Sequence, residues 1–428
     1  MANLPNPGPS NHPISYNVKY SRYVLSILFA ANMLNYIDRQ VIYAVFPLIK
    51  EDLHMSDTAL GSLGSVFMIS YMVAAPLFGW LGDRMKRVRV AACGLLTWSL
   101  ATTAAGFSYS YRTLLSARIL VGVGEASFGT VSPGIIADYF SRDRRGRILS
   151  LFYLAIPVGS AFGYLLGGVV GQHAGWHAAF MVVSVPGIIL SVPMYFLREP
   201  ARGGMDGTGT GGHASDGYMR LLRNRPFIIN TLAMAAMTFA LGGLAQWVPT
   251  FLFRLHGLDV ATGNILFGLV TILAGITGTL SGGWLGDYFQ RKSMKGYLLV
   301  SGWGFLVGVP ITIYALATHS TAVCLGATFC AEFFLFLSTG PLNTVIVNVT
   351  SPAVRAMAFA VNIFFIHALG DAISPVVIGV LSDIAGLRPA LMITPCAILI
   401  AALFSFLCMR FIGDHIEGPR RDTNYPTL

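Results

Sequence analysis

The chain has 428 residues, of which 54% are hydrophobic and only 11% are charged, and its mean hydropathy is +0.65. So few charges cannot cover the surface of a soluble globular protein, which means that most of the surface must face lipid. The net charge of +9 does not indicate a nucleic-acid partner, because the basic residues follow the parity of the loops instead of forming one patch.

Apolar stretches of roughly 20 residues, the length that crosses a bilayer as a helix, follow one another along the chain. They are centred near Ala30, Met72, Thr97, Gly124, Gly163, Val185, Ala240, Ala274, Val307, Phe334, Phe365 and Ile400. Lys and Arg are concentrated in alternate loops, so the positive-inside rule predicts that both termini are cytoplasmic. We therefore predict an all-α, multi-pass integral membrane protein with twelve transmembrane helices. Residues 1–20 are polar and do not resemble a signal peptide.

A polar, Gly-rich segment divides the apolar stretches into two groups of six. The predicted organisation is a cytoplasmic tail (1–20), a six-helix bundle (21–200), a cytoplasmic linker (201–225), a second six-helix bundle (226–412) and a cytoplasmic tail (413–428). The pentapeptide Gly-Trp-Leu-Gly-Asp at 79–83 recurs at 283–287, 283 − 79 = 204 positions later. Internal repeats in a membrane protein are typical of alternating-access transporters, whose substrate site lies between the repeats.

Two rows of glycines have the spacing of one helix face. One row is Gly159, Gly163, Gly167 and Gly171, and the other is Gly278, Gly282 and Gly286. Small residues in such rows allow two helices to approach closely. The rows are ordinary packing faces, smooth faces along which the two bundles rock, or both.

Ionisable residues inside the apolar stretches are costly and mark functional sites by default. In the first half they are Asp38 and Arg39 in the first helix and Arg118 and Glu125 in the fourth. Counting turns predicts that Asp38, Arg118 and Glu125 form one cluster facing a central cavity. Arg118 would offer a planar donor fork to a phosphate or carboxylate, and a carboxylate that Arg118 leaves would take up a proton. A purely structural salt bridge is the alternative.

In the second half, Glu332 lies in the tenth helix, and His367 and Asp371 lie in the eleventh. His367 and Asp371 are four residues apart on one face, so they are candidates for proton transfer or ion coordination, or for a structural hydrogen bond. We expect Glu332 to belong to the same polar patch. No metal-ligand spacing accompanies these residues, so we expect no cofactor, and a proton as the coupling ion.

The loop after the first pentapeptide carries a second set of candidates: Gly79, Asp83, Arg84 and Arg87. Asp138 ends the fourth helix on the same side, and we expect Arg84 to reach it. Such an inner-face network would act as a latch that stabilises one conformation. The second copy keeps Gly283 and Asp287 but has Tyr288 in place of the arginine.

These residues resemble a known family. The pattern Gly79-x-Leu81-x-Asp83-Arg84-x-x-Arg87 is similar to the loop motif of the major facilitator superfamily. A narrower resemblance, to the Spinster family of lysolipid transporters, rests on Asn35-Tyr36-Ile37-Asp38-Arg39, Val121-Gly122-Val123-Gly124-Glu125-Ala126-Ser127, Ile156-Pro157-Val158-Gly159-Ser160, Arg198-Glu199-Pro200 and His367-Ala368-Leu369-Gly370-Asp371.

The resemblance implies the major facilitator fold and a lysophospholipid or phosphorylated sphingoid base as substrate, moved by alternating access. It implies proton coupling in some members of the family, with Asp38, Arg118 and Glu125 serving headgroup recognition and coupling. The short loops suit a bacterial member in the cell membrane, and we expect a monomer.

Three other functions are compatible with the sequence. A proton-coupled symporter of a small organic anion fits because Arg118 would bind a carboxylate as readily as a phosphate. A membrane-embedded enzyme acting on lipids would have to use His367 and Asp371, and leaves the repeat unexplained. A passive channel fits the two-bundle repeat less well than a gated carrier does.

Overall fold

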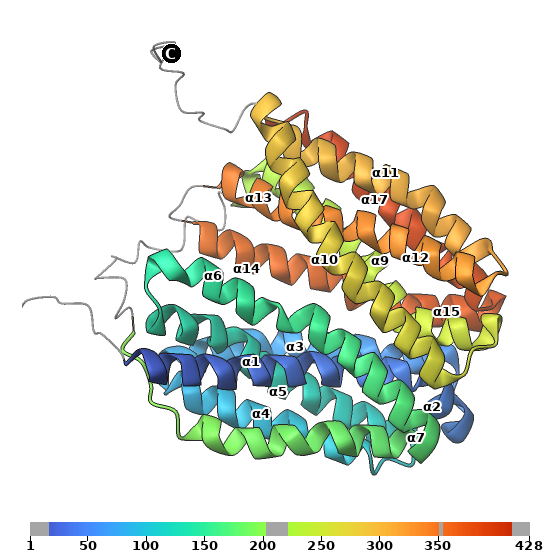
Figure 1. Cartoon of the computed structure of the whole chain (residues 1–428), viewed down its shortest axis with the longest axis horizontal. Helices are drawn as coiled ribbons and strands as arrows, with labels where there is room; N and C mark the ends of the chain where they lie inside the picture. The colour runs from blue at the N-terminus through green and yellow to red at the C-terminus, as the bar shows by residue number, and fades with distance from the viewer. Residues whose placement is uncertain (1–16, 203–220, 351–353, 413–428) are drawn as a thin grey trace, which may run out of the picture.

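The computed structural model describes residues 17–202, 221–350 and 354–412, and within these ranges every regular element is helical (Figure 1). The first half contains α1 (Val18–Ala44), α2 (Phe46–Leu53), α3 (Asp57–Arg84), α4 (Arg87–Ala105), α5 (Tyr111–Tyr139), α6 (Arg142–Tyr153) and α7 (Ala155–Tyr195). The second half contains α9 (Arg225–His256), α10 (Val260–Lys292), α11 (Gly296–Ala317), α12 (Thr321–Leu337), α13 (Thr339–Val349), α14 (Arg355–Ile366), η1 (His367–Asp371), α15 (Ser374–Ala385), α16 (Leu387–Leu391) and α17 (Ile393–Cys408).

The described helices account for the twelve predicted crossings. Ten segments are long and apolar enough to span a bilayer. One of them, 147–195, contains two crossings, because the backbone leaves the helical region at Gly175 (φ 84°, ψ 158°). The 27-residue helix α1 supplies the remaining crossing. The prediction of an all-α integral membrane protein is confirmed.

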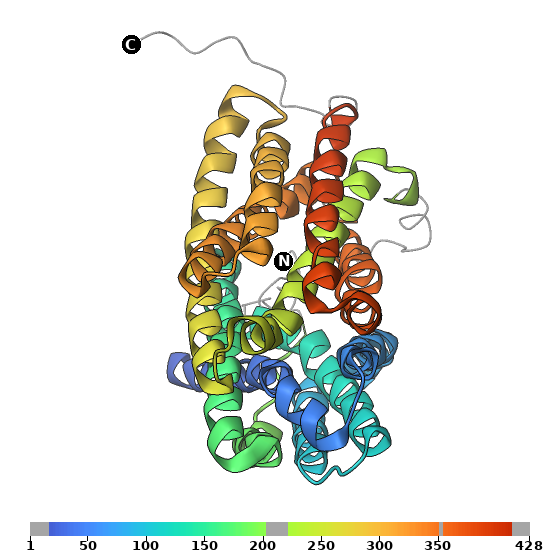
Figure 2. The ribbon, with the colours of Figure 1, turned by 90° about the vertical axis from the view of Figure 1, so that its right-hand side faces the viewer.

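The helices pack in two groups that follow the two halves of the sequence. In the first half α1 packs on α7, and α5 packs on α3 and α4. In the second half α17 packs on α9 and α11, and α12 packs on α10 and α11. Turned by 90° from Figure 1, the second group still lies above the first (Figure 2). They meet mainly where α7 contacts α10 and where α3 contacts α15.

The two ends of the molecule differ. The loops that carry Arg84 to Arg89 and Arg291 to Lys295 lie at one end, here called the basic end. The other end, here called the far end, carries α2, the start of α3 and the end of α15, at the right of Figure 1. Side chains cap several helices at the far end: the Ser56 hydroxyl accepts from the Ala59 amide, and the Asp259 carboxylate accepts from the Thr262 amide.

The glycine rows are packing faces within each half. An added Cβ at Gly163 would lie 2.6 Å from the carbonyl oxygen of Ile37 in α1, and one at Gly282 would lie 1.9 Å from the carbonyl oxygen of Leu337 in α12. Because each row faces a helix of its own half, the rows are not surfaces along which the halves rock. The interface between the halves uses other glycines instead: Gly168 packs on Asn264, and Gly268 packs on Ala161.

Replacing Gly163 by alanine is expected to destabilise the protein by about 1–3 kcal/mol, because the new methyl group overpacks the contact between α1 and α7. The melting temperature of purified protein in detergent measures this. Gly326→Ala is the matched control: no heavy atom outside its own helix lies within 4 Å of the added Cβ. Equal melting temperatures for the two variants would contradict this account of the row.

Candidate functional site

The charged residues of the first half lie together in the interior, with a different pairing from the one predicted. The Arg39 guanidinium donates from Nε to Oε2 of Glu125 at 2.7 Å, and Glu125 is fully buried. The Asp38 carboxylate accepts a 2.5 Å hydrogen bond from the Thr102 hydroxyl of α4. The expected grouping of Asp38, Arg118 and Glu125 is therefore present, but Arg39, not Arg118, is the direct partner of Glu125.

Arg118 is the unusual member of this group. Its side chain is buried, with 1% of its surface exposed, yet none of its three guanidinium nitrogens has a hydrogen-bond partner among the described residues. Its guanidinium carbon lies 4.6 Å from the centre of the Phe67 ring, and its charge interacts with the carboxylates of Asp38 and Glu125. A buried arginine with unused donors is costly unless a ligand supplies acceptors.

Arg39 sits in an aromatic surround that the sequence did not reveal. Its guanidinium lies 5.0 Å from the ring centres of Tyr36 and Tyr71 and 5.3 Å from that of Phe67. Phe67 thus lies under two guanidinium groups, a favourable cation–π arrangement. The Arg39 side chain is 15% exposed, so Arg39 presents a positive charge at the edge of the cluster. Tyr36 belongs to the motif that includes Asp38, but nothing in the sequence indicated Phe67 or Tyr71.

His367 and Asp371 form a close pair in the second half. The imidazole Nδ1 lies 2.9 Å from Oδ1 of Asp371, and both side chains are partly exposed. They occupy η1, a short π-helical turn between α14 and α15, a feature that is frequent at functional sites. Asp371 packs on Gly242 of α9, and its charge acts on the hydroxyl of Tyr43, which also senses Arg118. Tyr43 is therefore within electrostatic range of charged groups from both halves.

Glu332 is buried elsewhere in the second half. It faces Thr271 of α10, and its charge acts on Tyr164 of α7. No contact joins it to His367 or Asp371 among the residues that the structure describes. The expected single polar patch is therefore two separate sites, because Glu332 points to α10 and the π-helical turn points to α9.

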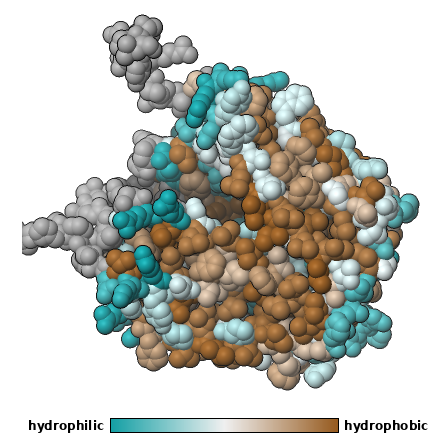
Figure 3. All heavy atoms as spheres, viewed as in Figure 1, coloured by the Kyte–Doolittle hydropathy of each residue, from teal (hydrophilic) through white to brown (hydrophobic). Residues whose placement is uncertain are grey.

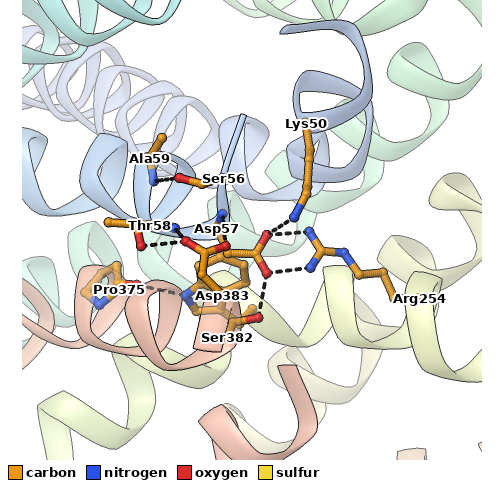
Figure 4. Close-up of polar contacts among 10 residues, drawn as sticks. Lys50, Ser56, Asp57, Thr58, Ala59, Arg254, Pro375, Ser382 and Asp383 are labelled. Carbon is orange, nitrogen blue, oxygen red and sulfur yellow. Dashed lines mark hydrogen bonds and ion pairs between the residues drawn. The ribbon is translucent and has the colours of Figure 1, made fainter. Parts of the chain in front are cut away.

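A polar network joins the two halves at the far end (Figure 4). The Asp57 carboxylate at the start of α3 accepts two hydrogen bonds from Arg254 of α9, at 2.7 and 2.8 Å, and further ones from Lys50 and Ser382. The Asp383 carboxylate of α15 accepts from the amides of Asp57 and Thr58, each at 2.8 Å. We call Lys50, Asp57, Thr58, Arg254, Ser382 and Asp383 the far-end latch.

The latch is one of several contacts that close the far end. The Tyr164 hydroxyl donates to the Ala245 carbonyl oxygen, and the Asn264 amide donates to the Ala44 carbonyl oxygen. Across the described ranges, the hydrogen bonds between the halves lie from the middle of the molecule to the far end. The surface is hollowed between the two groups toward the opposite end, beside the grey segments in Figure 3.

At the basic end the motif loop is held by ion pairs within the first half. Arg87 pairs with Asp138 at 2.7 Å and with Glu199 at 3.0 Å. Arg202 donates to the carbonyl oxygens of Gly82, Asp83 and Met85.

Arg84 is not the partner of Asp138. It belongs to the last turn of α3 and stacks on Trp80 at 4.1 Å, whereas Arg87 begins the next helix and faces Asp138. Gly79 lies in the same helix, beside Thr130. The network predicted at this end is present, with Arg87 in the place assigned to Arg84.

The second copy of the repeat is held differently. Asp287 accepts a 2.7 Å hydrogen bond from the Tyr297 hydroxyl, and the Gln290 side chain accepts from the Tyr297 amide. Gly283 has open space around it. One tyrosine of α11 thus fills the role that ion pairs fill in the first half.

Comparisons with known proteins agree with this fold. The sequence profile of the Major Facilitator Superfamily matches residues 28–374. Protein spinster homolog 1 of Xenopus tropicalis is 36% identical over 392 residues, which cover 86% of this chain and 74% of that protein. Sphingosine-1-phosphate transporter SPNS2 of Mus musculus is 35% identical over 435 residues, covering 92% of this chain and 78% of that protein.

A solved structure has the same fold. It is a bacterial homolog of the human lysosomal transporter Spinster, in an inward-facing and unoccupied conformation. It superposes with a TM-score of 0.86 at 24% identity, over 94% of this chain and all of the other. The chain therefore belongs to the Spinster family of the Major Facilitator Superfamily and is a membrane transporter, not an enzyme.

Proposed function

We propose that this protein carries an amphipathic anionic lipid, either a lysophospholipid or a sphingoid phosphate, across the membrane by alternating access coupled to protons. The observation that carries the proposal is Arg118, a buried guanidinium whose donors have no acceptor among the described residues. A phosphate offers the acceptor oxygens that match such a fork. The mouse relative named a sphingosine-1-phosphate transporter supports the same class of substrate.

The surroundings of Arg118 suit a ligand with one charged end and one apolar end. Arg39 adds a second positive charge at the edge of the cluster, and Tyr36, Phe67 and Tyr71 surround it. With Asp38 and Glu125 ionised, the cluster is neutral, so an incoming anion adds a negative charge beside two carboxylates. Protonation of one carboxylate offsets that charge, which links anion binding to proton uptake.

Alternating access is supported by the contrast between the two ends. The far-end latch joins the halves, whereas at the basic end the pairs of Arg87 with Asp138 and Glu199, both within the described ranges, stay inside the first half. Breaking the far-end latch and closing the basic end would expose the interior charged cluster on the far side of the membrane. We further propose that the basic end is cytoplasmic, that the protein works as a monomer in a bacterial cell membrane, and that 21–200 and 226–412 are the moving bundles.

A headgroup panel tests the substrate class. The purified protein is reconstituted into proteoliposomes, and uptake of a labelled lysophospholipid is measured. Sphingoid phosphate, uncharged lysolipid analogues and small carboxylates are added in turn as competitors. We expect the two anionic lipids to compete and the small carboxylates to have no effect. Competition by small carboxylates alone would instead indicate a symporter of small organic anions, and chemical conversion of the recovered lipid would contradict simple transport.

The proposed proton coupling predicts the behaviour of two isosteric variants. Glu125→Gln and Asp38→Asn each remove a carboxylate that has one oxygen without a hydrogen-bond partner in the described part of the chain. We expect each variant to lose accumulation driven by a pH gradient while keeping part of the exchange down a substrate gradient. Glu51→Gln, which changes an exposed glutamate of α2, is the control. If both variants keep the pH dependence of the original protein, neither carboxylate carries the coupled proton.

A further inference from the structure

The outer surface of the second half contains an apolar groove between α10, α11 and α12. Its volume is about 430 Å³, and its polar lining is negligible. Leu285 and Phe289 of α10 form one wall, and Val300, Gly304 and Val307 are among the residues of α11 that form the other. None of the lining residues belongs to the charged cluster in the interior. The groove is therefore a separate site.

The same groove occurs in the first half, between α3, α4 and α5, with a volume of about 260 Å³. The two sets of lining residues correspond by position in the duplicated sequence. Leu81 and Met85 match Leu285 and Phe289 at an offset of 285 − 81 = 204, the offset of the repeated pentapeptide. The facing helices correspond at an offset of 300 − 90 = 210, which pairs Val90 with Val300, Gly94 with Gly304 and Thr97 with Val307. The duplication has thus preserved a hollow as well as a loop.

The groove of the second half opens toward the bilayer. Trp303 and Val307 keep 57% and 41% of their surface exposed on a helix that crosses the membrane. An open apolar hollow at that depth is filled by hydrocarbon, because neither water nor a polar group is stable there. An acyl chain is therefore the chemically suitable occupant.

Basic residues stand at the mouth of this groove. Lys292 lies three residues after Phe289, and Lys295 lies four residues before Leu299, so each lies about one turn beyond a lining residue toward the basic end. Residues 287–295 carry three basic side chains and one carboxylate, a balance of 3 − 1 = +2. The Lys292 ammonium donates to the Tyr288 hydroxyl at 2.6 Å, which leaves two of its three donors for a ligand.

Both copies also carry the aromatic residues that are typical of the membrane interface. Trp284 and Tyr288 stack at 6.0 Å between ring centres beside the second mouth, and Trp284 is exposed. Trp80 is exposed at the equivalent position of the first copy, and Arg89 lines the first groove itself. Tryptophan and tyrosine at this level mark the depth of lipid headgroups.

We propose that each copy of the repeat forms a binding site for an anionic membrane phospholipid. One acyl chain lies in the groove, and the phosphate-bearing headgroup contacts Lys292 and Lys295 in the second half and Arg89 in the first. This lipid is a bound component of the bilayer, held at the loops that follow the repeat. It is distinct from the transported molecule in the interior.

Lipid retention tests the larger site directly. The protein is reconstituted into vesicles of equal parts phosphatidylglycerol and phosphatidylcholine with matched chains, extracted in mild detergent, and analysed for bound lipid by native mass spectrometry. We expect the original protein to retain phosphatidylglycerol preferentially. The variant Lys292→Gln/Lys295→Gln is expected to lose about fivefold in retention for each lysine removed, and Val307→Trp, which fills the groove from the lipid side, to lose the bound lipid independently of charge.

The matched control is Lys19→Gln/Arg22→Gln, which removes two exposed basic residues from the start of α1 at the same end. It should retain phosphatidylglycerol, and melting temperatures should show that all variants remain folded. Equal retention by all variants, or equal retention of the two lipids by the original protein, would overturn the proposal. Loss of the bound lipid in Arg118→Lys would also overturn it, because the lipid would then be the transported molecule in the interior. A failure of transport alone would bear only on the proposed function.

Discussion

Replacing Arg118 by lysine is expected to reduce uptake of an anionic lysolipid by about ten- to a hundredfold while most of the protein remains folded. Lysine keeps the positive charge but loses the planar fork that binds two phosphate oxygens at once. Charge-assisted hydrogen bonds contribute about 1.5–3 kcal/mol each, and 1.4 kcal/mol is a factor of ten in affinity. The loss should appear in the dissociation constant as well as in uptake.

Arg118→Ala separates this role from a structural one. Removing the charge leaves the buried carboxylates of Asp38 and Glu125 with Arg39 as the main remaining counter-charge, and breaking such a buried group costs about 3–5 kcal/mol. We therefore expect alanine to lower the melting temperature clearly and lysine to lower it much less. A variant that retains its melting temperature but loses headgroup binding identifies a recognition residue.

The matched control is Arg112→Lys, the same exchange at an exposed position of the same helix. It should leave both uptake and binding unchanged. If Arg118→Lys takes up the lipid as fast as the original protein, measured below saturation, the guanidinium of Arg118 does not hold the headgroup.

The sequence predicted the fold and the members of the interior cluster, but not the pairs within it. Hydropathy alone predicts the twelve helices, because an apolar segment that crosses lipid must pair its backbone hydrogen-bonding groups within itself and therefore forms a helix. Turn counting then places Asp38 and Arg118 at similar depths, with Glu125 nearer the midplane. It cannot distinguish Asp38 from its neighbour Arg39, which points about 100° away around the helix. That rotation directs Arg39 to Glu125 and Asp38 to Thr102.

The same limit explains the error at the basic end. Arg84 and Arg87 are three residues apart, but α3 ends at Arg84 and α4 begins at Arg87, so the two side chains point in different directions. Glu199, the second partner of Arg87, lies 112 positions away in sequence, and local spacing cannot reveal such a contact. The far-end latch was missed for the same reason, since Asp57 and Ser382 are 325 positions apart.

One signal for the latch was present in the sequence. The side opposite the basic loops carries few cations, among them Lys50 and Arg254, and both bind Asp57 in the structure. A rare basic residue on the side of the membrane that carries few cations can therefore indicate a contact that closes that side.

Replacing Asp57 by asparagine is expected to open the far end. The Asp57 side chain is 3% exposed, so its interactions with Arg254 are weakly screened, although Arg254 and Lys50 are partly exposed themselves. Loss of the two-point contact should destabilise the closed far end by about 1–3 kcal/mol, a value between those of exposed and buried ion pairs. Such a change shifts the ratio of the two conformations by about fivefold to about 150-fold.

Spin labels report this opening. Cysteines at Arg112 and Ala322, two exposed positions at the far end in different halves, are labelled in a protein whose exposed native cysteines Cys93, Cys330 and Cys396 are replaced by serine. We expect a longer distance to gain population in Asp57→Asn. Asp259→Asn is the control, because this exposed residue caps α10 without joining the halves, and asparagine caps equally well.

The distance measurement also distinguishes a latch from a packing contact. Gly61 and Gly379 bring α3 and α15 so close that a Cβ on either would lie 2.2 to 2.4 Å from a backbone oxygen of the other helix. If this backbone packing alone closes the far end, Asp57→Asn will leave the distance distribution unchanged. If the Asp57 carboxylate closes the far end, Asp57→Asn will shift the distance distribution. The transported lipid binds both conformations during the cycle, and adding it will then shift the distributions of the original protein and of Asp57→Asn to different extents. Transport then requires that the free energy of the latch be similar to the difference in substrate binding free energy between the open and closed far end. If the latch were much stronger than this difference, substrate binding would not open the far end.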